Sequence, residues 1–226
     1  MSRHTPRTFS QFRHRLVTTG AALLLLMTPG NALKAQVTTY SSLSAWLAAV
    51  SGSGLDTFND LSLDVNNPPP SLSRSAGSFT YVARATEGLF AVGPVGDTWL
   101  STNTANDVLS FDSFSPAVRG IGGLFFGTDI DGVLIPSGTL RVSWATSAGN
   151  GFLDLVNPSA TTFFGLTVNG TITSLSLQDL TPDDEANYWP TANDLRLATV
   201  VPEPSTYLLV GMALAMLVVL RRWKRA

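Results

Sequence analysis

The chain of 226 residues contains no cysteine, and its two histidines, His4 and His14, both lie in the first 35 residues. Residues 36–201 also contain no lysine. These absences exclude thiol catalysis, iron–sulfur clusters and zinc held by cysteine or histidine from that stretch. They also exclude Ser-His-Asp and Ser-Lys catalysis and Schiff-base chemistry. An enzyme built here would have to rely on carboxylates.

Basic residues are scarce in the middle of the chain. Residues 36–201 hold five arginines against fifteen carboxylates, although the formal charge of the whole chain is only −2. The remaining basic residues gather at the two ends. A strongly acidic middle repels phosphate groups, so we expect no nucleic-acid partner.

The first 35 residues have the pattern of a secretory signal peptide. A basic region ends at Arg15, the short apolar run LVTTGAALLLLM follows, and Pro29 and Gly30 interrupt the helix. Cleavage after Ala32 and cleavage after Ala35 both fit, and an uncleaved anchor is the alternative. The pattern predicts export through the Sec translocon and processing by signal peptidase. About 165 mature residues are enough to bury a core without disulfides.

Residues 36–200 read as one mainly β domain that begins with a short helix. Within Tyr40–Val50 a serine, Ser41 or Ser42, precedes apolar residues spaced i, i+3, i+4 and i+7, which predicts a helix with Leu43, Trp46, Leu47 and Val50 on one face. Turn residues then recur every eight to twelve positions between short runs rich in Val, Thr, Phe and Leu.

Two segments show the alternation of a half-buried strand. In Gly138–Ser147 the apolar Leu140, Val142 and Trp144 alternate with polar residues, and Leu109–Ser113 behaves in the same way. Asn169-Gly170 predicts a type I′ hairpin turn. We expect an antiparallel, jelly-roll-like β-sandwich with the early helix packed on one side or across one end.

The chain closes with three consecutive features. An extended Pro-Glu-Pro segment comes first, then an apolar helix over 206–220, then a basic tail over 221–226. The helix would rise about 21 Å, against a hydrocarbon core of about 30 Å, so it would just cross a thin bilayer. Basic residues stay on the cytoplasmic side, which places the acidic middle outside. The basic residues are Arg221, Arg222, Lys224 and Arg225.

This arrangement over residues 201–226 resembles the PEP-CTERM sorting signal of Gram-negative bacteria. The resemblance implies that an exosortase, a membrane peptidase, recognises the motif Val201-Pro202-Glu203-Pro204-Ser205 and cuts the tail. It implies a precursor tethered transiently to the inner membrane and then a product at the cell surface or in the extracellular matrix. Hosts of such proteins tend to make exopolysaccharide and biofilm. An ordinary tail anchor that is never cut is the alternative.

The middle of the chain resembles the β-sandwich passengers that precede such tails. The resemblance covers about residues 38–199 and implies no defined activity. It rests on TTYSSLSAWLAAV, LDTFND, GDTWLST, VRGIGGLFFGTD and FFGLTVNGTITSLSL. The glycine-rich GIGGLFFG within it lacks a lysine and the spacing of a phosphate loop, so we interpret it as a closely packed strand.

Two groups of residues are candidates for binding. Asp129 and Asp131 in GTDIDG offer alternating oxygens suited to Ca²⁺, although a turn shaped by these aspartates accounts for the pattern equally well. Tyr188 and Trp189 follow an acidic segment, and exposed rings beside carboxylates would stack on sugars. The alternative is that these rings fold back onto the domain. The acidic segment contains Asp183, Asp184, Glu185 and Asn187.

These observations favour an exported surface or matrix protein that is not an enzyme, is associated with exopolysaccharide and binds no cofactor other than Ca²⁺. The alternative is a secreted glycan hydrolase that uses two carboxylates. The glutamates before the tail are Glu87 and Glu185.

Overall fold

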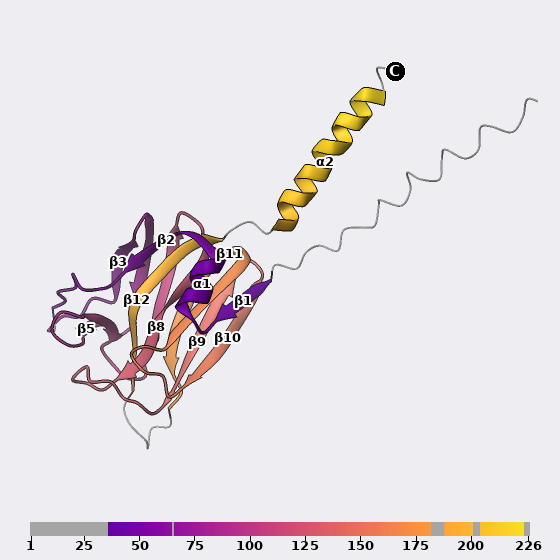
Figure 1. Ribbon diagram of the computed structural model, residues 1–226. Coiled ribbons are helices and arrows are strands. Elements are labelled where there is room, and N and C mark those ends of the chain that lie inside the picture. Colours follow the sequence, from indigo (N-terminus) through magenta and orange to yellow (C-terminus); the bar gives the residue numbers. More distant parts are fainter. Residues whose placement is uncertain (1–35, 65, 182–187, 201–203, 224–226) are drawn as a thin grey trace, which may run out of the picture. The chain divides into compact units, whose positions relative to one another are not determined.

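The computed structural model describes residues 36–64, 66–181, 188–200 and 204–223 (Figure 1). Several predicted features therefore lie outside the described residues. They are the signal peptide over 1–35, the acidic segment over 182–187, and Val201, Pro202, Glu203, Lys224 and Arg225.

Most of the described chain is antiparallel β-structure, which confirms the expected mainly β class. The strands are β1 (Val37–Tyr40), β2 (Val50–Asp56), β3 (Ser71–Ala76), β4 (Phe79–Arg84), β5 (Leu89–Val92), β6 (Trp99–Thr102), β7 (Leu109–Ser115), β8 (Val118–Thr128), β9 (Thr139–Thr146), β10 (Gly149–Val156), β11 (Phe163–Asp179) and β12 (Trp189–Val200). The helices are α1 (Leu43–Ala49) and α2 (Pro204–Trp223).

The strands form one continuous sheet that curves toward a barrel, and the long strand β11 joins its two parts. Residues 163–168 of β11 pair with β1 and β8 in one part of the sheet, and residues 172–179 pair with β7 and β9 in the other. β8 continues to β12, while β7 continues to β4 and β3. A jelly-roll sandwich would have two separate sheets, whereas here β11 belongs to both parts (Figure 1).

The predicted hairpin at Asn169-Gly170 is wrong, because both residues lie inside β11. They stand where β11 changes partners: Val168 pairs with Val37 of β1, and Ile172 pairs with Thr146 of β9. The Asn169 amide donates to the carbonyl of Gln36 rather than closing a turn. A strand that passes from one part of a curved sheet to the other must bend, and a glycine tolerates that bend.

The main hydrophobic core lies between the two parts of the sheet. It combines Phe125, Phe164 and Leu197 from one part with Phe111 and Leu175 from the other, all almost fully buried. The alternation predicted from the sequence is confirmed for Leu109, Phe111, Leu140 and Val142, which are completely buried. Burial of this apolar surface is the main source of stability, at about 25 cal/mol per Å².

The predicted N-terminal helix is present as α1, with Ser42 at its N-cap position. Trp46 is fully buried, and its indole N–H donates to the carbonyl of Leu166 over 3.2 Å. Val50 is buried as well, at the start of β2. Leu47 is 41% exposed, so its predicted place on the buried face is wrong. The helix has only seven residues and contacts the sheet mainly through one indole, which leaves Leu47 in solvent.

The GIGGLFFG segment forms part of β8, as predicted for a closely packed strand. A Cβ on Gly120 would lie 2.9 Å from Val50, and one on Gly122 would lie 2.8 Å from the Phe163 ring. These glycines leave room for large side chains to lie flat on the strand.

The C-terminal helix α2 begins at Pro204, a residue suited to the first turn of a helix because its missing N–H needs no partner there. It is longer than the predicted 206–220. In the part of the chain that the structure describes, no helix reaches the length and hydropathy that a membrane span requires. The predicted transmembrane helix therefore stays a prediction.

Candidate functional site

The Asp129 segment forms a turn built by one carboxylate. Asp129 Oδ1 accepts hydrogen bonds from the backbone amides of Asp131 and Val133, at 2.9 and 2.8 Å. Gly132 completes the turn with φ of 77°. Among the described residues, no three His, Cys, Asp or Glu side chains gather closely enough to hold a metal ion. Calcium binding at Asp129 and Asp131 stays a prediction, and the turn geometry accounts for Asp129 without it.

Tyr188 is fully buried, so of the two alternatives at this position the ring folds back onto the domain and is not available for glycan contact. Its ring covers Gly127, where a Cβ would lie 2.0 Å from the ring, and Gly138, where a Cβ would lie 2.8 Å away. Two glycines distant in sequence thus make the space that the ring fills. Among the described residues the Tyr188 hydroxyl has no hydrogen-bond partner. Burial, with a contribution from Asp179, raises the pKa of Tyr188.

The tryptophans differ in their surroundings. Trp189, the second predicted glycan contact, is half-buried at the start of β12. Trp99 is buried edge-on against Phe126, with ring centroids 4.8 Å apart, and donates its indole N–H to Asp97. Trp144 is half-buried and stacks on Phe164. Glycan contact by the partly exposed Trp189 stays a prediction.

The most developed polar cluster in the domain surrounds Asp56. Arg74 donates to both oxygens of Asp56, at 2.9 and 2.6 Å, and also pairs with Asp60. The Tyr81 hydroxyl donates to Asp56 over 2.6 Å, and the Phe58 amide donates over 3.0 Å. Asp56 is only 3% exposed at its side chain. The cluster therefore fixes the chain after β2 against β3 and β4.

The pKa values in this cluster follow from burial and pairing. Burial opposes the charge on Arg74, but hydrogen bonds to Asp60 and Asp56 outweigh it and raise the pKa of Arg74. The hydrogen bond from Arg74 lowers the pKa of Asp60. Burial, followed by the charge of Asp56, raises the pKa of Tyr81. All three groups therefore keep their usual protonation states at neutral pH.

Most of the described carboxylates of the domain form hydrogen bonds or ion pairs within the protein, as Asp56 does. Ten of the twelve that the structure describes between residues 36 and 200 make a hydrogen bond or ion pair within the protein. They are Asp56, Asp60, Asp64, Asp97, Asp107, Asp112, Asp129, Asp154, Asp179 and Asp194. Glu185, one of the two glutamates considered for hydrolysis, lies outside the described residues.

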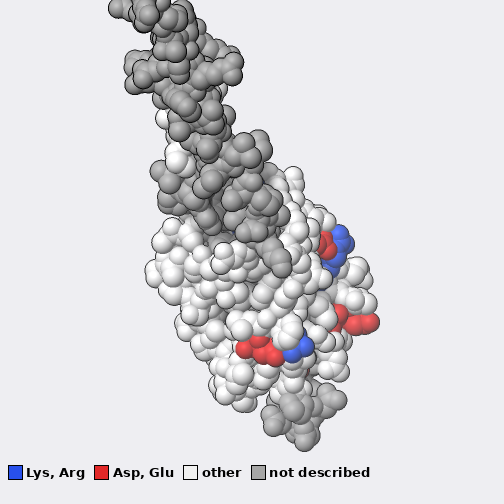
Figure 2. All heavy atoms as spheres, turned by 90° about the vertical axis from the view of Figure 1, so that its right-hand side faces the viewer, with Lys and Arg blue, Asp and Glu red and all other residues white. Residues whose placement is uncertain are grey.

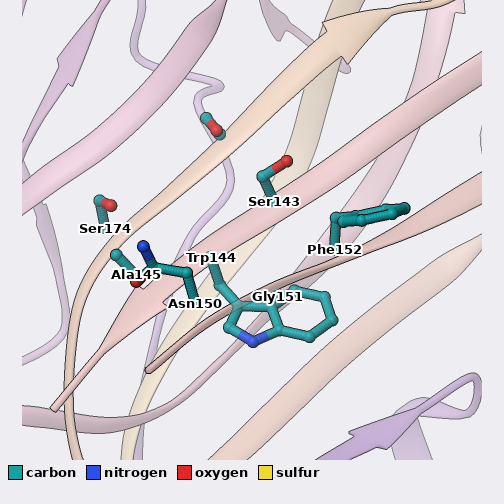
Figure 3. A pocket seen from close by; sticks show the side chains of 8 residues that line it. Ser143, Trp144, Ala145, Asn150, Gly151, Phe152 and Ser174 are labelled. Atoms are coloured by element: carbon teal, nitrogen blue, oxygen red, sulfur yellow. The ribbon is translucent and has the colours of Figure 1, made fainter. Parts of the chain in front are cut away.

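A shallow groove of about 420 Å³ lies on the surface formed by β9, β10 and the end of β11 (Figure 3). Strand register places its side chains in two rows across the three strands. Phe152, Ser143 and Ser176 form one row, and Asn150, Ala145 and Ser174 form the next. Figure 3 shows Ser143 and Phe152 on one side of the strands and the Trp144 indole on the other.

The aromatic wall of the groove is held in place by an ion pair. The Arg141 guanidinium lies 4.1 Å from the centre of the Phe152 ring, and it also donates two hydrogen bonds to Asp154, at 2.7 and 2.9 Å. These hydrogen bonds lower the pKa of Asp154 and raise that of Arg141. Phe152 nevertheless remains 58% exposed. Stacking with arginine on one face orients the ring and leaves the rest of it accessible.

The surroundings of the groove carry little unpaired charge. On the side of the molecule where β1 and β10 lie, most of the visible surface is neither basic nor acidic, and the Lys and Arg atoms lie beside Asp or Glu atoms (Figure 2). None of the residues that line the groove is charged. Long-range attraction of an ionic ligand is therefore weak here.

Sequence reasoning did not identify the groove, because its residues come from segments up to 33 positions apart and most are small or polar. One signal was available. In β11, Ser174 and Ser176 alternate with the buried Leu175 and Leu177, which places both hydroxyls on the outer face.

The C-terminal segment is the second candidate site. Pro204 and Ser205 of the predicted motif form the first turn of α2, and Arg221 lies exposed near its other end. A proline-rich motif, an apolar helix and a basic end, in this order, define the class of proteins that are sorted by a C-terminal signal. The family model described as the PEP-CTERM protein-sorting motif matches residues 200–225. The chain therefore carries a PEP-CTERM sorting motif, as the resemblance in sequence predicted.

This motif implies an exported protein, a membrane-anchored precursor in a Gram-negative bacterium, and an exosortase-type processing partner. The match covers the C-terminal segment and does not extend into residues 36–199. No curated protein matches the chain.

Proposed function

We propose that the chain is an exported, non-catalytic protein of the cell surface or extracellular matrix, delivered there by exosortase-type removal of its C-terminal segment. The match of residues 200–225 to the PEP-CTERM sorting motif carries this proposal. Residues 1–35 direct the chain to the Sec translocon and signal peptidase. The C-terminal helix then holds the precursor in the inner membrane, with its basic end in the cytoplasm.

The side chains of α2 support a membrane-associated precursor. Those that the structure describes are mostly apolar and exposed, and such a surface is unfavourable in water unless lipid or another protein covers it. They are Val210, Met212, Leu214, Met216, Leu217, Leu220 and Trp223.

The use of carboxylates in the β-domain favours a matrix protein over a glycan hydrolase. Hydrolysis needs two carboxyl groups about 5–10 Å apart that are free to act on one sugar. Ten of the twelve acids that the structure describes in this domain are instead bound to other groups of the protein, as at Asp56, Asp97 and Asp154. We assign the domain a binding role toward extracellular polysaccharide rather than a catalytic one.

The test is to follow the protein in its host after deletion of residues 201–226 and, separately, after Glu203→Ala. The intact chain is expected at the cell surface or in the matrix. The deletion variant is expected to escape retention and appear soluble in the periplasm or medium, and Glu203→Ala is expected to accumulate as uncut precursor in the membrane. Arg84→Gln, which alters an exposed ion pair of the domain, is the control and is expected to be sorted normally. The same location for all four proteins, with residues after 205 still present in the intact chain, would overturn the proposal.

A further inference from the structure

The groove on β9, β10 and β11 contains polar side chains with unused hydrogen-bonding capacity. Within the described part of the chain, the hydroxyls of Ser143, Ser174 and Ser176 and the side-chain amide of Asn150 make no hydrogen bond to the protein. Elsewhere in the domain many serine and threonine hydroxyls bond to the backbone or to each other, as those of Thr146 and Ser159 do. The four groups therefore offer both donors and acceptors to a ligand.

Phe152 adds an apolar surface to this polar row. A phenyl ring that is 58% exposed, yet fixed by Arg141, presents an oriented apolar face next to hydroxyl and amide groups. Sugars have the matching pair of properties, since hydroxyls surround their rings and C–H groups line the ring faces. Stacking of such a face on an aromatic ring is favourable, and the fixed ring loses little conformational freedom on binding.

The charge and length of the groove restrict the class of ligand further. The lining residues are uncharged, and the nearest guanidinium, that of Arg141, is neutralised by Asp154. An anionic chain would find no free cation among the residues that line the groove. From Phe152 to Ser176 the row crosses two strand spacings, about 10 Å, which matches the length of a short oligosaccharide segment.

We propose that this groove binds a segment of a neutral polysaccharide, with Phe152 stacking on a sugar ring and Asn150, Ser143 and Ser176 bonding hydroxyls. This inference rests on the proposed function and gives it a site and a ligand class. The site differs from the sequence-predicted contact at Trp189, which belongs to β12 and does not line the groove.

The experiment measures binding of the full chain, purified in mild detergent, by its retardation in native gels that contain laminarin, dextran or galactomannan. Alginate serves as the anionic comparison. The wild-type chain is expected to be retarded by at least one of the neutral polysaccharides and not by alginate. Phe152→Ala is expected to weaken binding about tenfold, since loss of a stacked ring removes about 1.4 kcal/mol. Asn150→Ala is expected to weaken it severalfold.

Two controls test whether the retardation results from binding in the groove. Val156→Ala removes an exposed apolar side chain from the same strand outside the groove, and it is expected to bind as the wild type does. Thermal unfolding of Phe152→Ala is expected to match that of the wild type, because the ring is mostly exposed. A loss of binding in Phe152→Ala then reflects a missing contact with the polysaccharide rather than a loss of fold.

Three outcomes would overturn the assignment: no retardation by any neutral polysaccharide, retardation by alginate alone, or unchanged binding by Phe152→Ala and Asn150→Ala. Loss of binding in Trp189→Ala with full binding in Phe152→Ala would move the glycan site to β12. None of these results bears on tail processing, which Phe152→Ala is expected to leave intact.

Discussion

Arg74 holds both carboxylate oxygens of Asp56 in the interior of the domain, through Nε at 2.9 Å and Nη2 at 2.6 Å. The pair connects the end of β2 to β3, two strands that are not hydrogen-bonded neighbours in the sheet. Because Tyr81 and the Phe58 amide also donate to Asp56, the carboxylate is fully engaged where water cannot replace its partners.

Replacement of Asp56 by alanine is therefore expected to lower the free energy of unfolding by about 3–5 kcal/mol, since it leaves the buried Tyr81 hydroxyl without an acceptor and Arg74 with only the exposed Asp60 as its partner. Urea unfolding followed by tryptophan fluorescence measures the change. The matched control is Asp112→Ala, which breaks the exposed pair with Arg84 and is expected to cost less than about 1 kcal/mol. Equal losses in the two variants would show that the buried cluster contributes no more than a surface pair.

The two buried tyrosines are expected to make the domain sensitive to alkali. Burial raises the pKa of both Tyr81 and Tyr188, so the folded state keeps protons that the unfolded state loses above about pH 10. The stability that each tyrosine contributes is fully present below about pH 10 and is lost as the pH rises toward the raised pKa of the folded state. At pH 11 each is expected to reduce the free energy of unfolding by about 1.4 kcal/mol.

Tyr188→Phe and Tyr81→Phe separate the two contributions. Tyr188→Phe is expected to keep about 1.4 kcal/mol more of its pH 8 stability at pH 11 than the wild type does, with little change at pH 8. Tyr81→Phe is expected to lose about 1–3 kcal/mol at pH 8, because Asp56 loses a donor. Urea midpoints at the two pH values provide the measurement, and parallel curves for wild type and Tyr188→Phe would contradict the assignment.

Gly127→Ala is expected to destabilise the domain by about 1–3 kcal/mol. The new methyl group would lie about 2.0 Å from the Tyr188 ring, and either the ring or β8 must move to admit it. Gly211→Ala in α2 is the control, since open space surrounds that position. Thermal unfolding compares the two, and an unchanged melting temperature for Gly127→Ala would show that Tyr188 does not pack on β8.

The basic end of the chain is expected to set the orientation of the precursor. Glutamine in place of Arg221, Arg222, Lys224 and Arg225 removes the charges that hold this end in the cytoplasm, so less of the precursor should present its motif outside. Pulse-chase labelling reports the ratio of precursor to processed protein. The same conversion rate with and without the four charges would argue against this orientation mechanism.

Local patterns predicted the local structure well. The i, i+3, i+4, i+7 spacing identified α1, and strict alternation identified the buried faces of β7 and β9, because each signal depends on neighbours within one element. The hairpin turn predicted at Asn169-Gly170 does not form, because the turn preference of this dipeptide is weaker than the pairing of β11 with strands in both parts of the sheet.

Features that depend on distant residues were not predictable in this way. Tyr188 follows a polar segment, but Gly127 and Gly138 create the space that buries it. The groove likewise appears only when β9, β10 and β11 align Asn150, Ser143 and Ser176. The sorting motif, in contrast, was predictable from the sequence, because it consists of features that follow one another along the chain.

The mass of the mature C-terminus tests the central claim most directly. Mass spectrometry of the protein from its host, with and without the exosortase-type peptidase, should show a chain that lacks the segment after the Pro-Glu-Pro motif in the first case and retains that segment in the second. A chain that retains the segment in both hosts would contradict the account.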